Sequence, residues 1–127
     1  MSSQTTWNPS EKIVAIDFDG VIHKYVSPWV SPDIVVDEPV EGIKDEIDKL
    51  RAAGYKVIVM SSRCLGDGGY AAIKNYLHQH NIKVDGITSE KIGACVYIDD
   101  RAMCFSGIAE GLFEDVVNFK PWQNRGN

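Results

Sequence analysis

The sequence predicts an α/β fold in which a mostly parallel sheet is covered by helices on both faces. Apolar runs at 12–16, 55–60 and 94–98 have the composition of strands buried inside such a sheet. Amphipathic segments separate these runs, and alternation of strands with helices is typical of parallel sheets joined by crossover helices. At 127 residues with 44% apolar content, the chain is long enough for one domain with its own core.

In the first half of the chain, the strand expected at 12–16 leads directly into Asp17. The stretch 21–39 contains three of the five prolines, which exclude a helix there and predict an irregular excursion or a small hairpin. Residues 41–53 predict an amphipathic helix, because apolar residues recur at helical spacing and Gly54 stands where a helix would end.

The second half continues the alternation. A strand at 55–60 is followed by a helix at about 70–80, a short weak strand within 82–88, and a strand at 94–98. A last helix is expected at about 108–118. Its apolar face would consist of Ile108, Leu112, Phe113, Val116 and Val117.

Composition excludes several classes of protein. Three cysteines without a CxxC pair argue against a disulfide framework or a zinc knuckle. The net charge of −5, without a basic block, disfavours non-specific binding of nucleic acid. No apolar run is long enough for a membrane span, and the N-terminus does not resemble a secretory signal. We therefore expect a cytoplasmic single domain over 1–127, with flexible ends at 1–10 and 123–127.

Polar side chains follow three of the expected strands. Asp17 and Asp19 follow the first strand, Ser61 follows the second, and Asp99 and Asp100 follow the last. In parallel sheets ligands bind at the carboxyl ends of the strands, so these groups should gather at one edge. Carboxylates this close repel each other unless a cation compensates, and Mg²⁺ is the natural oxygen-bound candidate. The sequence therefore predicts a metal and phosphate site.

These residues resemble, in order, the four motifs of the haloacid dehalogenase (HAD) superfamily. Residues 17–21 (DFDGV) resemble its first motif, DxDx[TV], and Ser61 resembles its second, a hydroxyl residue at a strand end. Lys91 is the best match to the lone basic residue of the third motif, and Asp99–Asp100 resemble the acidic pair of the fourth. The resemblance spans 13 to about 105.

The resemblance implies a HAD-like, Rossmann-like three-layer sandwich. Only 41 residues separate Asp19 from Ser61, and the helix expected at 41–53 uses many of them. No room is left there for a folded cap domain. The chain thus resembles the capless members, whose active site is open.

The resemblance also implies a Mg²⁺-dependent phosphomonoester hydrolase. Asp17 would attack phosphorus to form an aspartyl-phosphate, and Asp19 would act as general acid and then as general base. We expect neighbouring carboxylates to raise the pKa of Asp19 for the acid role. Ser61 would bind the phosphoryl oxygens, and Lys91 would offset their charge, with Lys83 as the substitute for Lys91.

The metal ligands implied by the resemblance are Asp17, the backbone carbonyl of Asp19, and the acidic pair. Asp100 is preferred over Asp99 as the direct ligand, because it aligns with the Asp of the family's alternative Gly-Asp form. The residues next to the motifs, which are candidates for contact with the substrate, are Gly20, His23, Ser62 and Arg63.

Two questions stay open in the sequence. A guanidinium at Arg63 or Arg101 could bind a second charge on the substrate, or could equally pair with an acidic residue of the protein. The substrate could be a phosphorylated small molecule or an exposed phosphate on a larger one. The alternatives to a phosphatase of small molecules are a non-catalytic regulator that binds metal or phosphate and a phosphatase that processes nucleic-acid ends.

Overall fold

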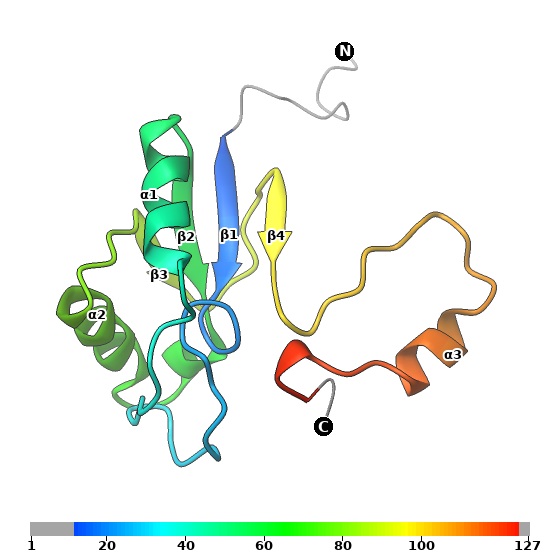
Figure 1. Ribbon diagram of the computed structural model, residues 1–127, viewed down its shortest axis with the longest axis horizontal. Coiled ribbons are helices and arrows are strands. Elements are labelled where there is room, and N and C mark those ends of the chain that lie inside the picture. Colours follow the sequence, from blue (N-terminus) through cyan, green and yellow to red (C-terminus); the bar gives the residue numbers. More distant parts are fainter. Residues whose placement is uncertain (1–11, 125–127) are drawn as a thin grey trace.

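Four parallel strands form one sheet in the computed structural model, which describes residues 12–124 (Figure 1). The strand order is β3-β2-β1-β4, and every neighbouring pair is parallel. The strands are β1 (Ile13–Asp17), β2 (Lys56–Met60), β3 (Gly86–Thr88) and β4 (Val96–Ile98). The predicted α/β class with a parallel sheet is therefore confirmed, with strands that are shorter or begin one to four residues later than expected.

Two helices pack on one face of this sheet. Helix α1 (Ile43–Ala52) connects β1 to β2, and α2 (Gly69–Gln79) connects β2 to β3. Ile47 of α1 and Ile73 of α2 are fully buried in one cluster with Val57 and Val59. Because Val57 and Val59 alternate along β2, they point to the same face, and both helices therefore cover that face.

The register brings the carboxyl ends of the central strands to the same level. Asp17 pairs with Met60 across β1 and β2, and Ile16 pairs with Ile98 across β1 and β4. The residues that follow these strands therefore meet at one edge, as in other parallel sheets.

The proline-rich stretch forms the predicted irregular excursion with a short hairpin-like base. The N–H of Lys24 donates to the carbonyl of Glu38 (3.1 Å), and the N–H of Val40 donates to that of Ile22 (2.8 Å). Between these bonds the chain has no regular structure and lies beyond the carboxyl ends of β1 and β2 (Figure 1).

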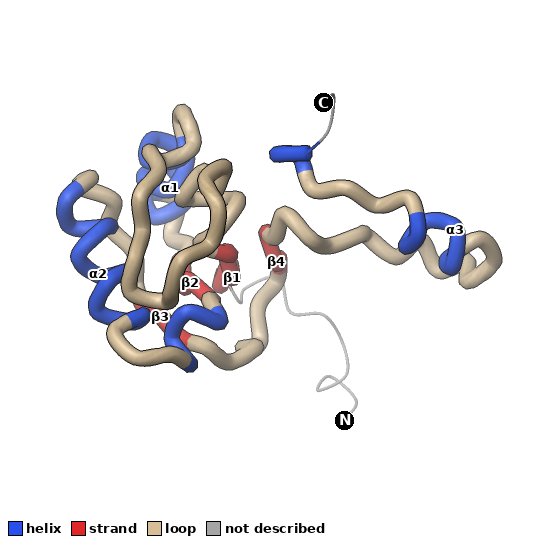
Figure 2. The backbone as a smooth tube through the Cα atoms, turned by 90° about the horizontal axis from the view of Figure 1, so that it is seen from below, coloured by secondary structure: helices blue, strands red, loops and turns tan. Residues whose placement is uncertain are grey.

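The predicted last helix is wrong in length and in packing. Helix α3 spans only Leu112–Val117 and stands apart from the sheet in both views (Figures 1 and 2). Gly107 and Gly111 have left-handed backbone (φ +93° and +91°), which interrupts the helix predicted from 108. Phe113 is 76% exposed, so α3 does not form a helical third layer. On the second face of the sheet, the crossover before β4 contacts Tyr97, whose hydroxyl donates to the carbonyl of Ile92.

The chain ends are described only in part. The predicted flexibility of 1–10 lies outside the described residues, as does that of 125–127. Gln123, the first residue of the expected flexible end, lies in a short 3-10 helix, Trp122–Asn124, that returns to the carboxyl end of the sheet. Among residues 12–124, no helix has the length and apolar character needed to cross a membrane.

Candidate active site

Three carboxylates gather where β1 and β4 end. Asp17, Asp99 and Asp100 each offer an oxygen that lies within 4.8 Å of the other two. The backbone N–H of Phe18 donates to Asp17 (2.9 Å), and the amide of Gln123 donates to Oδ2 of Asp100 (3.0 Å). The acidic pair and the first aspartate therefore lie together, as the sequence predicted.

The electrostatics of this cluster fit a divalent cation. Burial, followed by the negative charges of Asp99 and Asp100 and a hydrogen bond with Asp100, raises the pKa of Asp17 to about 8. A proton on Asp17 thus relieves the repulsion in the protein alone. Three convergent carboxylate oxygens are also a donor set that hard cations such as Mg²⁺ prefer. Both Asp99 and Asp100 belong to the cluster, so its geometry does not separate them as ligands.

Gly20 lies against this cluster and does not line the pocket beside it. Its backbone is left-handed (φ +86°), and a Cβ built there would stand 2.0 Å from Oδ2 of Asp100. Only glycine leaves room for the Asp100 carboxylate at this point. Gly20 therefore has a structural role beside the carboxylates, and its predicted contact with substrate stays a prediction.

An open pocket of about 1000 Å³ adjoins the carboxylates. Asp17, Ser61, Ser62 and Lys91 all line it, together with Asp99. The structure thus places one residue from each of the four motifs on the wall of one cavity.

Ser61 can donate a hydrogen bond into this pocket. Its side chain is buried, and its Oγ accepts a hydrogen bond from the backbone N–H of Arg63 (3.1 Å). No acceptor for the hydroxyl proton is found among residues 12–124. The proton is therefore free for an oxygen in the pocket.

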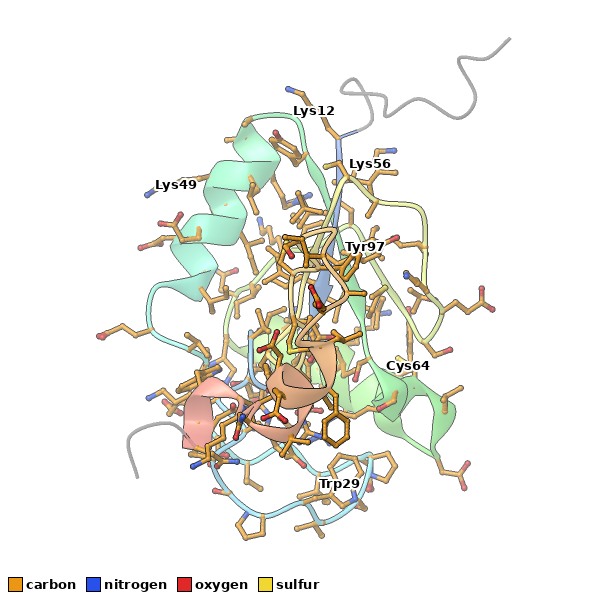
Figure 3. All side chains as sticks on the ribbon, turned by 90° about the vertical axis from the view of Figure 1, so that its right-hand side faces the viewer. Lys12, Trp29, Lys49, Lys56, Cys64 and Tyr97 are labelled. Carbon is orange, nitrogen blue, oxygen red and sulfur yellow. The ribbon has the colours of Figure 1, made fainter. Side chains whose placement is uncertain are left out.

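The two lysine alternatives are separated by the fold. The Nζ of Lys91 lies 5.1 Å from the centre of the Tyr97 ring, on the wall of the pocket. Figure 3, which views the molecule from the side on which β4 lies, labels Tyr97. Lys83 instead lines a different groove, with Leu77 of α2 and Ile87 of β3. Lys91 is thus the lysine near the carboxylates.

Asp19 does not join the carboxylates, contrary to prediction. Its Oδ1 lies 2.9 Å from Nδ1 of His23, and its Oδ2 accepts a hydrogen bond from Nε of Arg63 (2.8 Å). Burial alone would raise its pKa, but the bonds from His23 and Arg63 outweigh burial and lower it. The carbonyl of Phe18 accepts from the N–H groups of the next turn, so the extended backbone that would align Asp19 with Asp17 ends at β1.

His23 supports Asp19 and does not line the substrate mouth as predicted. It is 1% exposed, and its Nε2 accepts a hydrogen bond from the backbone N–H of Asp37 (3.0 Å). Because Nε2 accepts, the ring proton must be on Nδ1, which donates to Asp19. The carboxylate of Asp37 in turn accepts from Ser27, which closes the excursion around the histidine.

Arg63 does not line the pocket; of the two roles left open for it, the structure shows pairing with an acidic residue, Asp19. It is 3% exposed, and besides Asp19 it binds the excursion 31–34. Its Nη1 donates to the carbonyls of Ser31, Pro32 and Ile34 at 2.9–3.2 Å. Its guanidinium also lies 4.6 Å from the centre of the Trp29 ring, which Figure 3 shows at the lower end of the view, beyond the carboxyl ends of the strands. Arg63 therefore fixes the excursion to Asp19.

Two residues near the site carried no signal in the sequence. Gln123 holds Asp100, and the indole N–H of Trp122 donates to the carbonyl of Gly20 (2.5 Å). Both come from the C-terminal segment, more than twenty residues after the acidic pair, and no local pattern marks them.

Comparison with family models, curated proteins and solved structures gave no match. Functional assignment therefore rests on the residues and their geometry.

Proposed function

We propose that this protein is a Mg²⁺-dependent phosphomonoester hydrolase, a capless member of the HAD superfamily. The observation that carries the proposal is the meeting of Asp17, Ser61, Lys91 and Asp99 around one open pocket, with Asp100 beside them in the carboxylate cluster. These are the residues that match the four motifs, and they come from chain positions more than eighty residues apart. Phosphoryl transfer needs little more than positioning and charge stabilisation, which this set of groups can supply.

The metal would be held by Asp17, Asp99 and Asp100, and the family pattern adds the backbone carbonyl of Asp19. When bound, Mg²⁺ would offset the repulsion of these carboxylates, keep Asp17 ionised and draw charge from the phosphoryl oxygens. The proposal includes no cap domain, because the excursion between β1 and α1 has no regular structure. Arg63 and His23 fix this excursion in place.

The chain's own residues would act in two steps. An oxygen of Asp17 attacks phosphorus, the ester P–O bond breaks, and the leaving oxygen takes a proton from solvent water to give the free alcohol or phenol. Water then attacks the aspartyl-phosphate, its P–O bond breaks, and inorganic phosphate and the Asp17 carboxylate result. Ser61 donates to the phosphoryl oxygens, and Lys91 offsets their charge.

Asp19 fits the second step better than the first. Its lowered pKa keeps it ionised at neutral pH, so it can accept the proton of the attacking water once its side chain reaches the pocket. An aryl leaving group departs with little protonation. We therefore expect aryl phosphates to be better substrates than alkyl phosphates.

The test is hydrolysis of an aryl phosphate by wild type, Asp17→Asn and Asp45→Asn, each with Mg²⁺ and with a chelator. Asp45 is an exposed aspartate of α1 and serves as the matched control. We expect Mg²⁺-dependent turnover that falls at least about 10³-fold in Asp17→Asn and is unchanged in Asp45→Asn. Binding of Mg²⁺ without turnover would favour the regulator alternative, and failure to bind Mg²⁺ would contradict the whole proposal.

A further inference from the structure

Two cationic side chains on the wall of the pocket have no acidic partner. Lys91 and Arg101 both line it, and no carboxylate within residues 12–124 forms an ion pair with either. Lys91 is the expected partner of the transferred phosphoryl group. Arg101 has no role in the mechanism above.

The sequence left open whether Arg63 and Arg101 bind substrate or pair with acidic residues, and the two arginines differ in the structure. The guanidinium of Arg63 donates its hydrogen bonds to Asp19 and to backbone carbonyls. The guanidinium of Arg101 is exposed beside the site, although its backbone is anchored by an N–H bond to Oδ1 of Asp99 (2.8 Å). The backbone of Arg101 is therefore held next to the carboxylate cluster.

The pocket is far larger than a single phosphoryl group. Its volume of about 1000 Å³ is at the upper end of what small-molecule sites provide. Its walls also carry apolar surface from Met60, Tyr97 and Met103. The space beyond the carboxylates can therefore hold the rest of a substrate, with Arg101 at its side.

We propose that the pocket takes phosphomonoesters whose leaving group carries a second anionic group, and that Arg101 binds this group. The proposal rests on the proposed function. A planar guanidinium binds carboxylate and phosphate oxygens in pairs, so either group has the required chemistry. Arg101 thereby selects among substrates, while Lys91 serves the phosphoryl group that is transferred.

The kinetic test uses phenyl phosphate, 4-carboxyphenyl phosphate and hydroquinone bisphosphate. Each is assayed with wild type, Arg101→Gln and the control Arg51→Gln, an arginine of α1 outside this pocket that pairs with Asp85. We expect Arg101→Gln to lower kcat/KM for the anion-bearing substrates at least about 10-fold more than for phenyl phosphate. Comparing the carboxylate with the bisphosphate shows which second group is preferred.

Two kinetic results would overturn the proposal. An equal loss on all three substrates would mean that Arg101 serves the transferred phosphoryl group. An unchanged kcat/KM on all three would mean that Arg101 contacts no substrate.

A binding experiment separates this proposal from the phosphatase assignment. Phenylphosphonate and 4-carboxyphenylphosphonate are titrated calorimetrically into wild type and Arg101→Gln with Mg²⁺ present. We expect the carboxylated ligand to bind wild type about 10-fold more tightly, and this advantage to vanish in Arg101→Gln. The advantage without turnover would support the anion subsite and contradict the hydrolase. Turnover without the advantage, or no binding of either ligand, would overturn the subsite.

Discussion

Replacing Arg63 with methionine should destabilise the protein strongly, because it removes a buried charge and its hydrogen bonds. Methionine keeps an apolar side chain at this position, so the loss reports mainly on the charge. The guanidinium donates to Asp19 and to three carbonyls of the excursion at 2.8–3.2 Å. The side chain of Arg63 is 2% exposed, so water has little access to its guanidinium.

The expected loss in free energy of unfolding follows from the Asp19 carboxylate, which stays partly buried without its partner. Removing one member of a buried ion pair costs about 3–5 kcal/mol, because the other charge stays desolvated. The side chain of Asp19 is 19% exposed, which allows some hydration and favours the lower end of that range. We therefore expect Arg63→Met to lower the free energy of unfolding by about 3 kcal/mol and Tm by about 10 °C.

The matched control is Arg51→Met, which removes an arginine that also pairs with an aspartate. The Arg51–Asp85 pair has an N–O distance of 3.1 Å, but its side chains are 34% and 27% exposed. Such a pair contributes about 0.5 kcal/mol. Urea unfolding followed by far-ultraviolet circular dichroism gives both values. If Arg63→Met cost no more than Arg51→Met, the account of Arg63 as a buried clamp would be refuted.

Three further predictions test the cluster and the C-terminal helix. Gly20→Ala should weaken Mg²⁺ binding at least about 10-fold, because the added Cβ would collide with Asp100. Calorimetric titration with Mg²⁺ measures this, and an unchanged affinity would contradict the prediction. Phe113→Ala should cost under about 0.5 kcal/mol because the ring is exposed, whereas Ile73→Ala should cost about 2–5 kcal/mol; similar losses in urea unfolding would mean that α3 is packed. In metal-free protein, the raised pKa of Asp17 means that the folded state holds a proton the unfolded state has lost, so stability should fall as pH rises from about 4 to about 8. Mg²⁺ should therefore raise Tm more at the upper end of that range, and a flat Mg²⁺ effect, or the same pH slope in Asp17→Asn, would contradict this.

The sheet and the groups at its edge could be predicted because both follow from short-range patterns. Apolar runs identify β1, β2 and β4, because strands of parallel sheets are rich in apolar residues, although Val96 and Tyr97 of β4 are exposed. The meeting of Asp17 with Asp99 and Asp100 then follows from parallel topology alone.

The surroundings of Asp19 could not be predicted in the same way. The alternation that places it beside Asp17 holds only for extended backbone, and the chain turns directly after β1. Its partner Arg63 lies 44 residues away, and the residue type alone does not tell whether a guanidinium meets an acidic group of the protein or of a ligand.

The last helix shows the limit of helical periodicity. Apolar spacing in 108–118 is compatible with a helix, but Gly107 and Gly111 adopt left-handed backbone that this pattern does not reveal. The six residues of α3 that remain are too few to be stable without tertiary packing, and the spacing does not specify whether such packing exists.

The central claim is that Asp17 becomes phosphorylated during turnover. The most direct measurement mixes Asp19→Asn with excess aryl phosphate and Mg²⁺, quenches the reaction with acid and maps the peptides by mass spectrometry. Loss of the base that activates water should slow breakdown, so a phosphoryl group should accumulate on the peptide that contains Asp17. It should be absent when Asp17 is also replaced by asparagine. Turnover with no phosphoryl group on the protein, or with one on another residue, would contradict the account.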